Sequence, residues 1–173
     1  MRVVAGEFRG RRLAAPRGLR TRPTADRVRE ALFSILGDVT GARVLDLYAG
    51  SGALGIEALS RGAESAEFVE RDPRAAAVIE RNLASLGLDQ PVHRQDVLRF
   101  LGRTTGMFDL VFCDPPYDSA PRLAGTLAER LPALTPETAR IVTESDKRMP
   151  LELPFPLLTE RTYGDTRIAI HAR

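Results

Sequence analysis

The chain contains few residues of the kinds that form disulfides, metal centres and membrane spans. Cys113 is the only cysteine among 173 residues, which excludes a disulfide within the chain and is typical of a reducing compartment such as the cytosol. His93 and His171 are the only histidines, so the sequence offers no cluster of metal ligands and we predict no metal. No apolar run approaches the length of a membrane span, and no apolar core follows the basic N-terminus as it would in a signal peptide.

Lysine is almost absent as well, since Lys147 is the only lysine among 25 basic residues. The hydrophobic content of 43% and the charged content of 28% are those of an ordinary globular protein, and the length fits one main domain. The net charge of +2 is unevenly distributed. Residues 1–29 hold nine arginines against Glu7 and Asp26, a balance of +7, so the remaining 144 residues together carry −5.

A basic N-terminal segment on a mildly acidic body indicates a polyanionic partner. The planar guanidinium of arginine suits contacts with phosphate groups, and the positive field raises the rate of encounter. The alternative is a solvated tail in an arginine-rich protein. That alternative explains the preference for arginine over lysine but not the concentration of charge at one end. We therefore interpret residues 1–29 as a nucleic-acid contact.

Two apolar stretches, residues 3–5 and 13–15, predict a small hairpin or an extended arm. After a loop with prolines and glycine, Thr24 is a plausible N-cap of a helix that continues to about Leu36. The predicted apolar face of this helix consists of Val28, Ala31, Leu32 and Ile35. The arginines left for solvent or ligand are Arg22, Arg27 and Arg29.

From Ala42 onward, predicted strands alternate with predicted helices. The strands are 42–47, 66–70, 90–94, 108–113 and 139–144, and the helices are 53–61, 73–86, 97–102 and 119–131. This order implies a parallel sheet covered on both faces. The pair Gly164-Asp165, between apolar-polar stretches at 157–163 and 166–172, predicts an antiparallel hairpin.

A parallel sheet that ends in an antiparallel hairpin resembles the Rossmann-like α/β fold of class I methyltransferases. That resemblance implies seven strands in the order 3-2-1-4-5-7-6, with helices on both faces. We divide the chain into a basic N-terminal arm and helix, residues 1–36, and a methyltransferase domain, residues 37–173.

The first strand runs into a glycine loop, in which Gly50, Gly52 and Gly55 fit the pattern G-x-G-x-x-G. Glycine at the first two positions lets the backbone approach a ligand, and Gly55 permits close packing of helix on strand. Glu70 ends the next predicted strand, where its carboxylate can accept hydrogen bonds from both ribose hydroxyls. The pattern alone also fits a dinucleotide-dependent oxidoreductase, or glycines with a purely structural role.

Two further carboxylates favour a different cofactor. Asp46, just before the loop, would oppose a pyrophosphate but suits a cofactor with an ammonium group. Asp96 can accept from an adenine amine or act as the N-cap of the following helix, and both roles are compatible. Together these residues resemble the S-adenosylmethionine site of class I methyltransferases. The cofactor contacts predicted in this way are Asp46, Tyr48, Gly50, Ser51, Gly52, Glu70, Arg71, Asp96, Val97 and Asp114. Tyr48 fits equally well as a core aromatic residue.

The motif Asp114-Pro115-Pro116-Tyr117 directly follows a buried apolar run. The two prolines cannot continue a sheet, so the chain must leave the strand end as a stiff, extended loop. There Asp114 and the Pro115 carbonyl can accept from an exocyclic amine, Tyr117 can stack on the ring, and Pro116 can keep the loop rigid. A strand-ending turn is the simpler alternative. The motif resembles that of methyltransferases of nucleobase amines, so we predict these four residues as catalytic.

Three blocks in order carry a more specific resemblance: residues 22–33, which begin Arg-Pro-Thr, residues 45–63, and residues 114–117. Over nearly its whole length the chain resembles the bacterial 16S ribosomal RNA guanine-N2 methyltransferase family. The resemblance implies a monomeric cytoplasmic enzyme that uses S-adenosylmethionine, releases S-adenosylhomocysteine and methylates a guanine in the small subunit or an assembly intermediate. The RNA contacts would be Arg9, Arg11, Arg12, Arg20, Arg22, Thr24 and Arg27.

Three other functions stay open at this point. An adenine-N6 methyltransferase acting on RNA or DNA would use the same motif at 114–117, although the Arg-Pro-Thr block argues against it. A dinucleotide-dependent oxidoreductase would share the glycine loop and Glu70 but would leave that motif and the basic segment without a role. A non-catalytic RNA-binding module could have kept the fold, although the four intact carboxylates argue against that.

Overall fold

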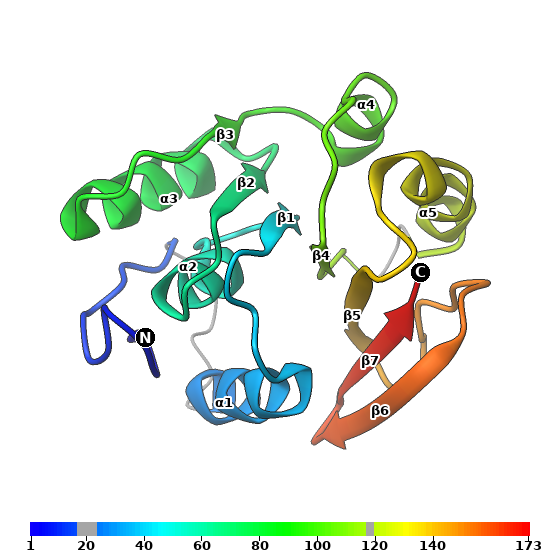
Figure 1. Cartoon of the computed structure of the whole chain (residues 1–173), viewed down its shortest axis with the longest axis horizontal. Coiled ribbons are helices and arrows are strands. Elements are labelled where there is room, and N and C mark those ends of the chain that lie inside the picture. Colours follow the sequence, from blue (N-terminus) through cyan, green and yellow to red (C-terminus); the bar gives the residue numbers. More distant parts are fainter. Residues whose placement is uncertain (17–23, 117–119) are drawn as a thin grey trace.

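A seven-stranded sheet in the order β3-β2-β1-β4-β5-β7-β6 runs through the computed structural model, which describes residues 1–16, 24–116 and 120–173 (Figure 1). The strands are β1 (Arg43–Leu47), β2 (Ser65–Val69), β3 (Val92–His93), β4 (Leu110–Cys113), β5 (Arg140–Asp146), β6 (Leu157–Tyr163) and β7 (Thr166–Ala172). Neighbours from β3 to β5 are parallel, and β7 pairs antiparallel with both β5 and β6. The predicted strands, their order and the terminal hairpin are confirmed, although β3 is reduced to two residues.

Helices cover both faces of the sheet, as predicted, with α1 to α3 on one side and α4 and α5 on the other (Figure 1). Their bounds are α1 (Thr24–Leu36), α2 (Ala53–Ser60), α3 (Pro73–Leu86), α4 (Val97–Leu101) and α5 (Ala120–Leu134). Alternation along the buried strands divides the core in two: Val44 packs with α1–α3, and Leu45 and Leu47 pack with α4 and α5. No helix among the described residues is long and apolar enough to cross a membrane.

The N-terminal arm, residues 1–16, is a short hairpin-like segment that lies against α2 and α3. Its two halves are joined by an antiparallel bridge between Arg2 and Arg12, with the Val3 amide donating to the Arg11 carbonyl at 3.0 Å. Gly6 has a φ of +82°, and an added Cβ there would lie 1.7 Å from the Ser60 carbonyl oxygen, so only glycine permits this approach. The arm shares the core of the α1–α3 face. The division of the chain at residue 36 stays a prediction.

Two side chains of α1 differ from the prediction. Ile35, assigned to the apolar face, is 38% exposed, because the buried stripe of the helix runs through Leu32, Phe33 and Leu36. Arg29 was predicted to be available to solvent or ligand but is only 4% exposed. It is paired with Glu57 of α2, which is 28 residues away in sequence and therefore was not recognisable as its partner.

Candidate active site

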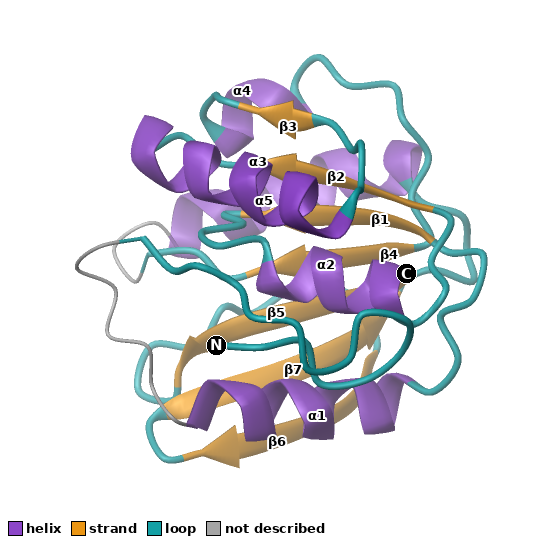
Figure 2. Cartoon of the chain, turned by 90° about the vertical axis from the view of Figure 1, so that its left-hand side faces the viewer, coloured by secondary structure: helices purple, strands orange, loops and turns teal. Residues whose placement is uncertain are grey.

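The predicted cofactor and catalytic residues lie at or just after the ends of strands that finish at one edge of the sheet. Leu47 at the end of β1 is in register with Val69 of β2 and with Cys113 of β4. The segments that follow these strands, the glycine loop (Tyr48–Gly55), Glu70–Arg71 and Asp114–Pro116, therefore emerge side by side. Figure 2 shows the arrowheads of β2, β3 and β4 on the same side of the molecule. Open α/β sheets bind their ligands at this edge.

Glu70 holds the glycine loop to the end of β2. One carboxylate oxygen of Glu70 accepts from the Gly50 amide at 3.0 Å, and the other accepts from the Asp72 amide at 2.8 Å. The loop has three residues with positive φ, namely Gly50, Gly52 and, unusually for a residue with a Cβ, Tyr48 at 58°. An added Cβ at Gly50 would meet only the Tyr48 carbonyl oxygen, at 3.9 Å. Of the two glycines where close approach of a ligand was predicted, Gly50 thus faces open space, whereas an added Cβ at Gly52 would lie 3.1 Å from Ile79 and 3.3 Å from Phe68 in the core.

Asp46 lies beneath this loop and is 2% exposed. Its carboxylate accepts from the Gly55 amide at 2.9 Å. An added Cβ at Gly55 would lie 2.4 Å from the ring of Phe68, so the close helix–strand packing predicted for this glycine is confirmed. Burial raises the pKa of Asp46 to about 7, against the opposing hydrogen bond from Gly55 and with a further rise from the Glu70 carboxylate.

The raised pKa of Asp46 predicts a pH-dependent stability. Because the folded chain holds this proton more tightly than the unfolded chain, the free energy of unfolding should fall as pH rises from about 4 to about 7. Asp46→Asn removes this loss, so between pH 5 and pH 8 the stability of the variant relative to wild type should rise by on the order of 2 kcal/mol. Urea unfolding at the two pH values measures it. Asp89→Asn, at the opposite end of the sheet, serves as the control, and an equal trend in both variants would contradict the assignment.

Asp96 acts as the N-cap of α4. Its carboxylate accepts from the amides of Leu98 at 3.0 Å and Arg99 at 3.2 Å. The N-cap role that the sequence suggested for Asp96 is therefore confirmed. Its contact with an adenine amine stays a prediction. Val97 begins the same helix and is 2% exposed, whereas Arg71 is exposed at the end of β2.

The described part of the motif, residues 114–116, leaves β4 at the centre of this edge. Asp114 and Pro116 are exposed, and Pro115 is buried. Burial raises the pKa of the neighbouring Cys113 thiol well above its ordinary value, and the Asp114 and Asp46 carboxylates raise it further. Asp46 is in register with Phe112 and Asp114 follows Cys113, so both carboxylates lie near the ends of the paired strands β1 and β4. Tyr117 lies outside the described residues.

The predicted RNA contacts form two groups. Arg9, Arg11 and Arg12 are exposed on the arm, and Arg27 is exposed on α1. Arg11 donates to the Ser85 carbonyl at 2.6 Å, which holds its side chain against α3. Arg20 and Arg22 lie outside the described residues, as does the side chain of Thr24.

Sequence reasoning missed buried polar residues that hold the arm to α2 and α3, among them Glu57 and Asn82. Glu57 lies within the apolar run of α2, and Asn82 lies within the apolar stripe of α3. A polar residue at an apolar position of a helical stripe was the only available signal, since apart from Arg61, one turn along α2 from Glu57, the partners named here are 28 to 68 residues away.

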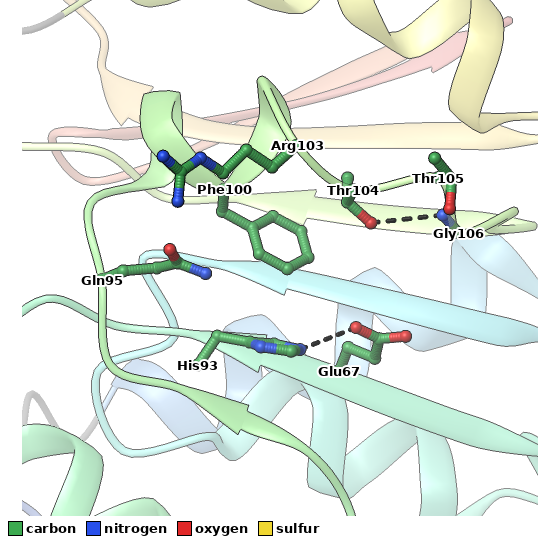
Figure 3. Close-up of a pocket in the computed structure, with 8 residues that line it drawn as sticks. All are labelled: Glu67, His93, Gln95, Phe100, Arg103, Thr104, Thr105 and Gly106. Carbon is green, nitrogen blue, oxygen red and sulfur yellow. Dashed lines mark hydrogen bonds and ion pairs between the residues drawn. The ribbon is translucent and has the colours of Figure 1, made fainter.

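An open groove beside β2 and β3 is lined by none of the predicted site residues, although Gln95 in its lining directly precedes Asp96 (Figure 3). Its volume is about 340 Å³, and it is lined by Glu67, His93, Gln95, Phe100, Arg103, Thr104, Thr105 and Gly106. His93 is hydrogen-bonded to Glu67 at 2.8 Å, and its ring lies 4.7 Å from that of Phe100. Within residues 1–16, 24–116 and 120–173, no group of three or more His, Cys, Asp or Glu side chains could hold a metal ion.

The sheet order, the terminal hairpin and the glycine loop after β1 define a class I methyltransferase fold. A solved structure, "Putative methyltransferase yhhF from Escherichia coli", matches it with a TM-score of 0.87 and 34% identity, covering 100% of this chain and 97% of that one. The family model described as conserved hypothetical protein 95 matches residues 1–172. The chain belongs to this family.

Relatives in the family carry methyltransferase names. "Putative rRNA methyltransferase YlbH" of Bacillus subtilis is 41% identical over 186 residues, covering 100% of this chain and 99% of that protein. "Ribosomal RNA small subunit methyltransferase D" of Haemophilus influenzae is 37% identical over 178 residues, covering 95% and 89%. The chain is thus a methyltransferase, which sets aside a dinucleotide-dependent oxidoreductase.

Proposed function

We propose that this protein transfers a methyl group from S-adenosylmethionine to the exocyclic N2 amine of a guanine in 16S ribosomal RNA of the small subunit. The observation that carries the proposal is the register of β1 with β4, which brings residues 114–116 beside Asp46 and the glycine loop. The names of the relatives support an RNA substrate from the small subunit.

The residues present fit S-adenosylmethionine. When bound, this cofactor supplies an electrophilic methyl group on a sulfonium. Gly50 leaves room for close approach, and Glu70 is held beside it, where its carboxylate oxygens can accept from ribose hydroxyls. A neighbouring ammonium group would favour the ionised form of buried Asp46, whose pKa is about 7. Asp96 would bind the adenine amine with the carboxylate that also caps α4.

Asp114 and Pro115 would prepare the guanine for attack. The lone pair of N2 is delocalised into the ring, so this amine is a poor nucleophile. When the Asp114 carboxylate and the Pro115 carbonyl accept its two hydrogens, the nitrogen becomes more pyramidal and its lone pair more localised. Tyr117 would stack on the base and Pro116 would keep the loop rigid. Most of the rate gain would come from holding the nitrogen in line with the methyl carbon.

The guanine must leave its stack to enter such a pocket, at a cost of a few kcal/mol. A target in a single-stranded loop would lessen this cost. After transfer, the proton on N2 leaves to Asp114 or to water. Residues 1–36 would contact phosphates around the target through Arg9, Arg11, Arg12, Arg20, Arg22, Thr24 and Arg27.

Neutralising the arm should weaken binding of RNA and flatten its salt dependence. The plot of log K against log salt has a negative slope. In the triple variant Arg9→Gln, Arg11→Gln, Arg12→Gln, each lost phosphate contact should make this slope shallower by about 0.7 for single-stranded RNA. A control with Lys147, Arg148 and Arg161 changed to glutamine removes three charges near the β6–β7 hairpin. Binding to small subunits at several salt concentrations measures both. An unchanged slope in the arm variant would leave the arm without this role.

The identity of the modified nucleoside tests the proposed reaction. The protein is incubated with S-adenosylmethionine labelled in its methyl group and with small subunits that lack the modification, and the RNA is digested for chromatography and mass analysis. N2-methylguanosine is the expected product. N6-methyladenosine would keep the site chemistry but replace the proposed base. Absence of label, with cofactor binding shown separately, would favour a non-catalytic RNA-binding module.

A further inference from the structure

Asn82 of α3 joins the N-terminal arm to the glycine loop. Its side-chain oxygen accepts from the Ala14 amide at 2.8 Å. Its side-chain nitrogen donates to the Ala14 carbonyl at 3.1 Å and to the Ser51 carbonyl at 2.9 Å. Asn82 is 2% exposed, and both amide hydrogens and one oxygen are thus engaged by two segments that are distant in sequence. The side-chain amide of Asn82 thus connects the backbone of Ala14, 68 residues earlier in the chain, with the backbone of Ser51, 31 residues earlier.

The two connected segments belong to the two halves of the proposed site. Ala14 lies two residues after Arg12, one of the predicted RNA contacts, and Ser51 lies between Gly50 and Gly52 of the glycine loop. A second contact joins the same segments, because the Ser51 hydroxyl donates to the Met1 sulfur at 3.3 Å. Figure 2 shows the N-terminal segment passing close to α2, the helix that the glycine loop begins.

An apolar residue would be the default at this position. Ile79, Leu83 and Leu86 of the same helix face are all buried in the core. A buried amide is costly unless its hydrogen bonds are made, and here they are made only while the arm and the loop keep their present relative position. Any shift of the Ser51 carbonyl must therefore either carry the Asn82 amide, and with it Ala14, or break a buried hydrogen bond.

We propose that Asn82 is a positioning residue that couples the arm to the cofactor loop, so that the RNA substrate and the cofactor bind with positive cooperativity. The inference rests on the proposed function, since it assigns the arm to RNA and the loop to S-adenosylmethionine. When RNA orders the arm, or when the cofactor orders the glycine loop, the Asn82 amide that both segments share becomes fixed. The second ligand then binds with a smaller loss of conformational entropy. By linkage, each ligand must raise the affinity of the other by the same factor.

The experiment measures that factor with S-adenosylhomocysteine and unmodified small subunits. The dissociation constant of the wild-type protein for subunits, determined without and with saturating S-adenosylhomocysteine, should improve at least about fivefold. Asn82→Leu fills the site with a side chain suited to the apolar stripe and removes all three hydrogen bonds. For this variant we expect the ratio of the dissociation constants for subunits, without and with S-adenosylhomocysteine, to fall to about 1 by the same linkage argument. Each ligand alone should still bind. Ser85→Ala, on the same helix with the bridge intact, is the control and should keep the wild-type ratio.

Each outcome decides the inference. A wild-type ratio near 1, or an Asn82→Leu ratio equal to that of wild type, would overturn it. Should Asn82→Leu fail to fold, Asn82→Ala removes the same hydrogen bonds and is measured instead. Binding of S-adenosylhomocysteine and formation of N2-methylguanosine by the wild-type protein are followed in parallel. If both are present while the ratio is unaffected by the substitution, the coupling fails and the proposed function stands. If both are absent, the proposed function fails and the coupling with it.

Discussion

Replacement of Asp114 by alanine should lower the rate of methyl transfer about 100- to 1,000-fold while the protein still binds S-adenosylmethionine. The carboxylate is exposed at the end of β4, beside the segments that we assign to the cofactor. Its proposed work is to accept a hydrogen from the guanine amine, an interaction that strengthens as the nitrogen becomes pyramidal. A group whose interaction is stronger in the transition state than in the ground state affects turnover more than binding.

The decisive measurement is the single-turnover rate on unmodified small subunits, together with the affinity for S-adenosylhomocysteine by calorimetry. Because Asp114 is also predicted to lie beside the cofactor, a few-fold weaker affinity is compatible with the hypothesis. Asp114→Asn, which keeps the shape and one acceptor oxygen, should fall between wild type and alanine. Asp89→Ala removes an exposed carboxyl before β3 and should leave the rate unchanged. Full turnover by Asp114→Ala would contradict the proposal that the Asp114 carboxylate accepts a hydrogen bond from the guanine amine.

Glu57→Gln should lower the free energy of unfolding by about 3–5 kcal/mol, the cost typical of breaking a buried ion pair from one side. The side chain of Glu57 is fully buried, and its partner Arg29 is 4% exposed. One carboxylate oxygen accepts from the Val4 amide at 2.8 Å and from Arg29 at 3.3 Å, and the other accepts from the Ala5 amide at 3.0 Å and from Arg61 at 2.9 Å.

A glutamine at this position would place an amide N–H against these donors and leave the buried guanidinium of Arg29 with Asp26 as its remaining carboxylate partner. The matched control is Glu80→Gln, which breaks the exposed pair of Glu80 with Arg94 and should cost about 0–1 kcal/mol. Urea unfolding of both variants gives the comparison. Equal losses would show that the buried pair does not anchor the arm. Faster hydrogen exchange at Val4 and Ala5 in Glu57→Gln would report release of the arm directly.

Local pattern predicted most of the elements, because periodicity and turn chemistry are properties of neighbouring residues. The hairpin around Gly164-Asp165 has the predicted bounds, and the helix at 73–86 begins and ends as expected, with Asp72 as its N-cap and Gly87 as its C-cap. The order of the strands came from the resemblance to class I methyltransferases, since the pairing of parallel strands involves contacts between residues far apart in the chain.

The sequence by itself determined the βα alternation, the terminal hairpin and the carboxylates placed at or just after strand ends, Asp46, Glu70, Asp96 and Asp114. Only the tertiary structure decided what those and other polar groups contact: Asp46 is buried against Gly55, and Asp96 caps α4. It also turned Arg29 inward to Glu57 and placed Asn82 between Ala14 and Ser51. The physical reason is the range of the interactions. Hydrophobic period and turn preference act over a few residues, whereas a buried charge or amide is stable only beside a partner that the fold brings from a distant part of the chain.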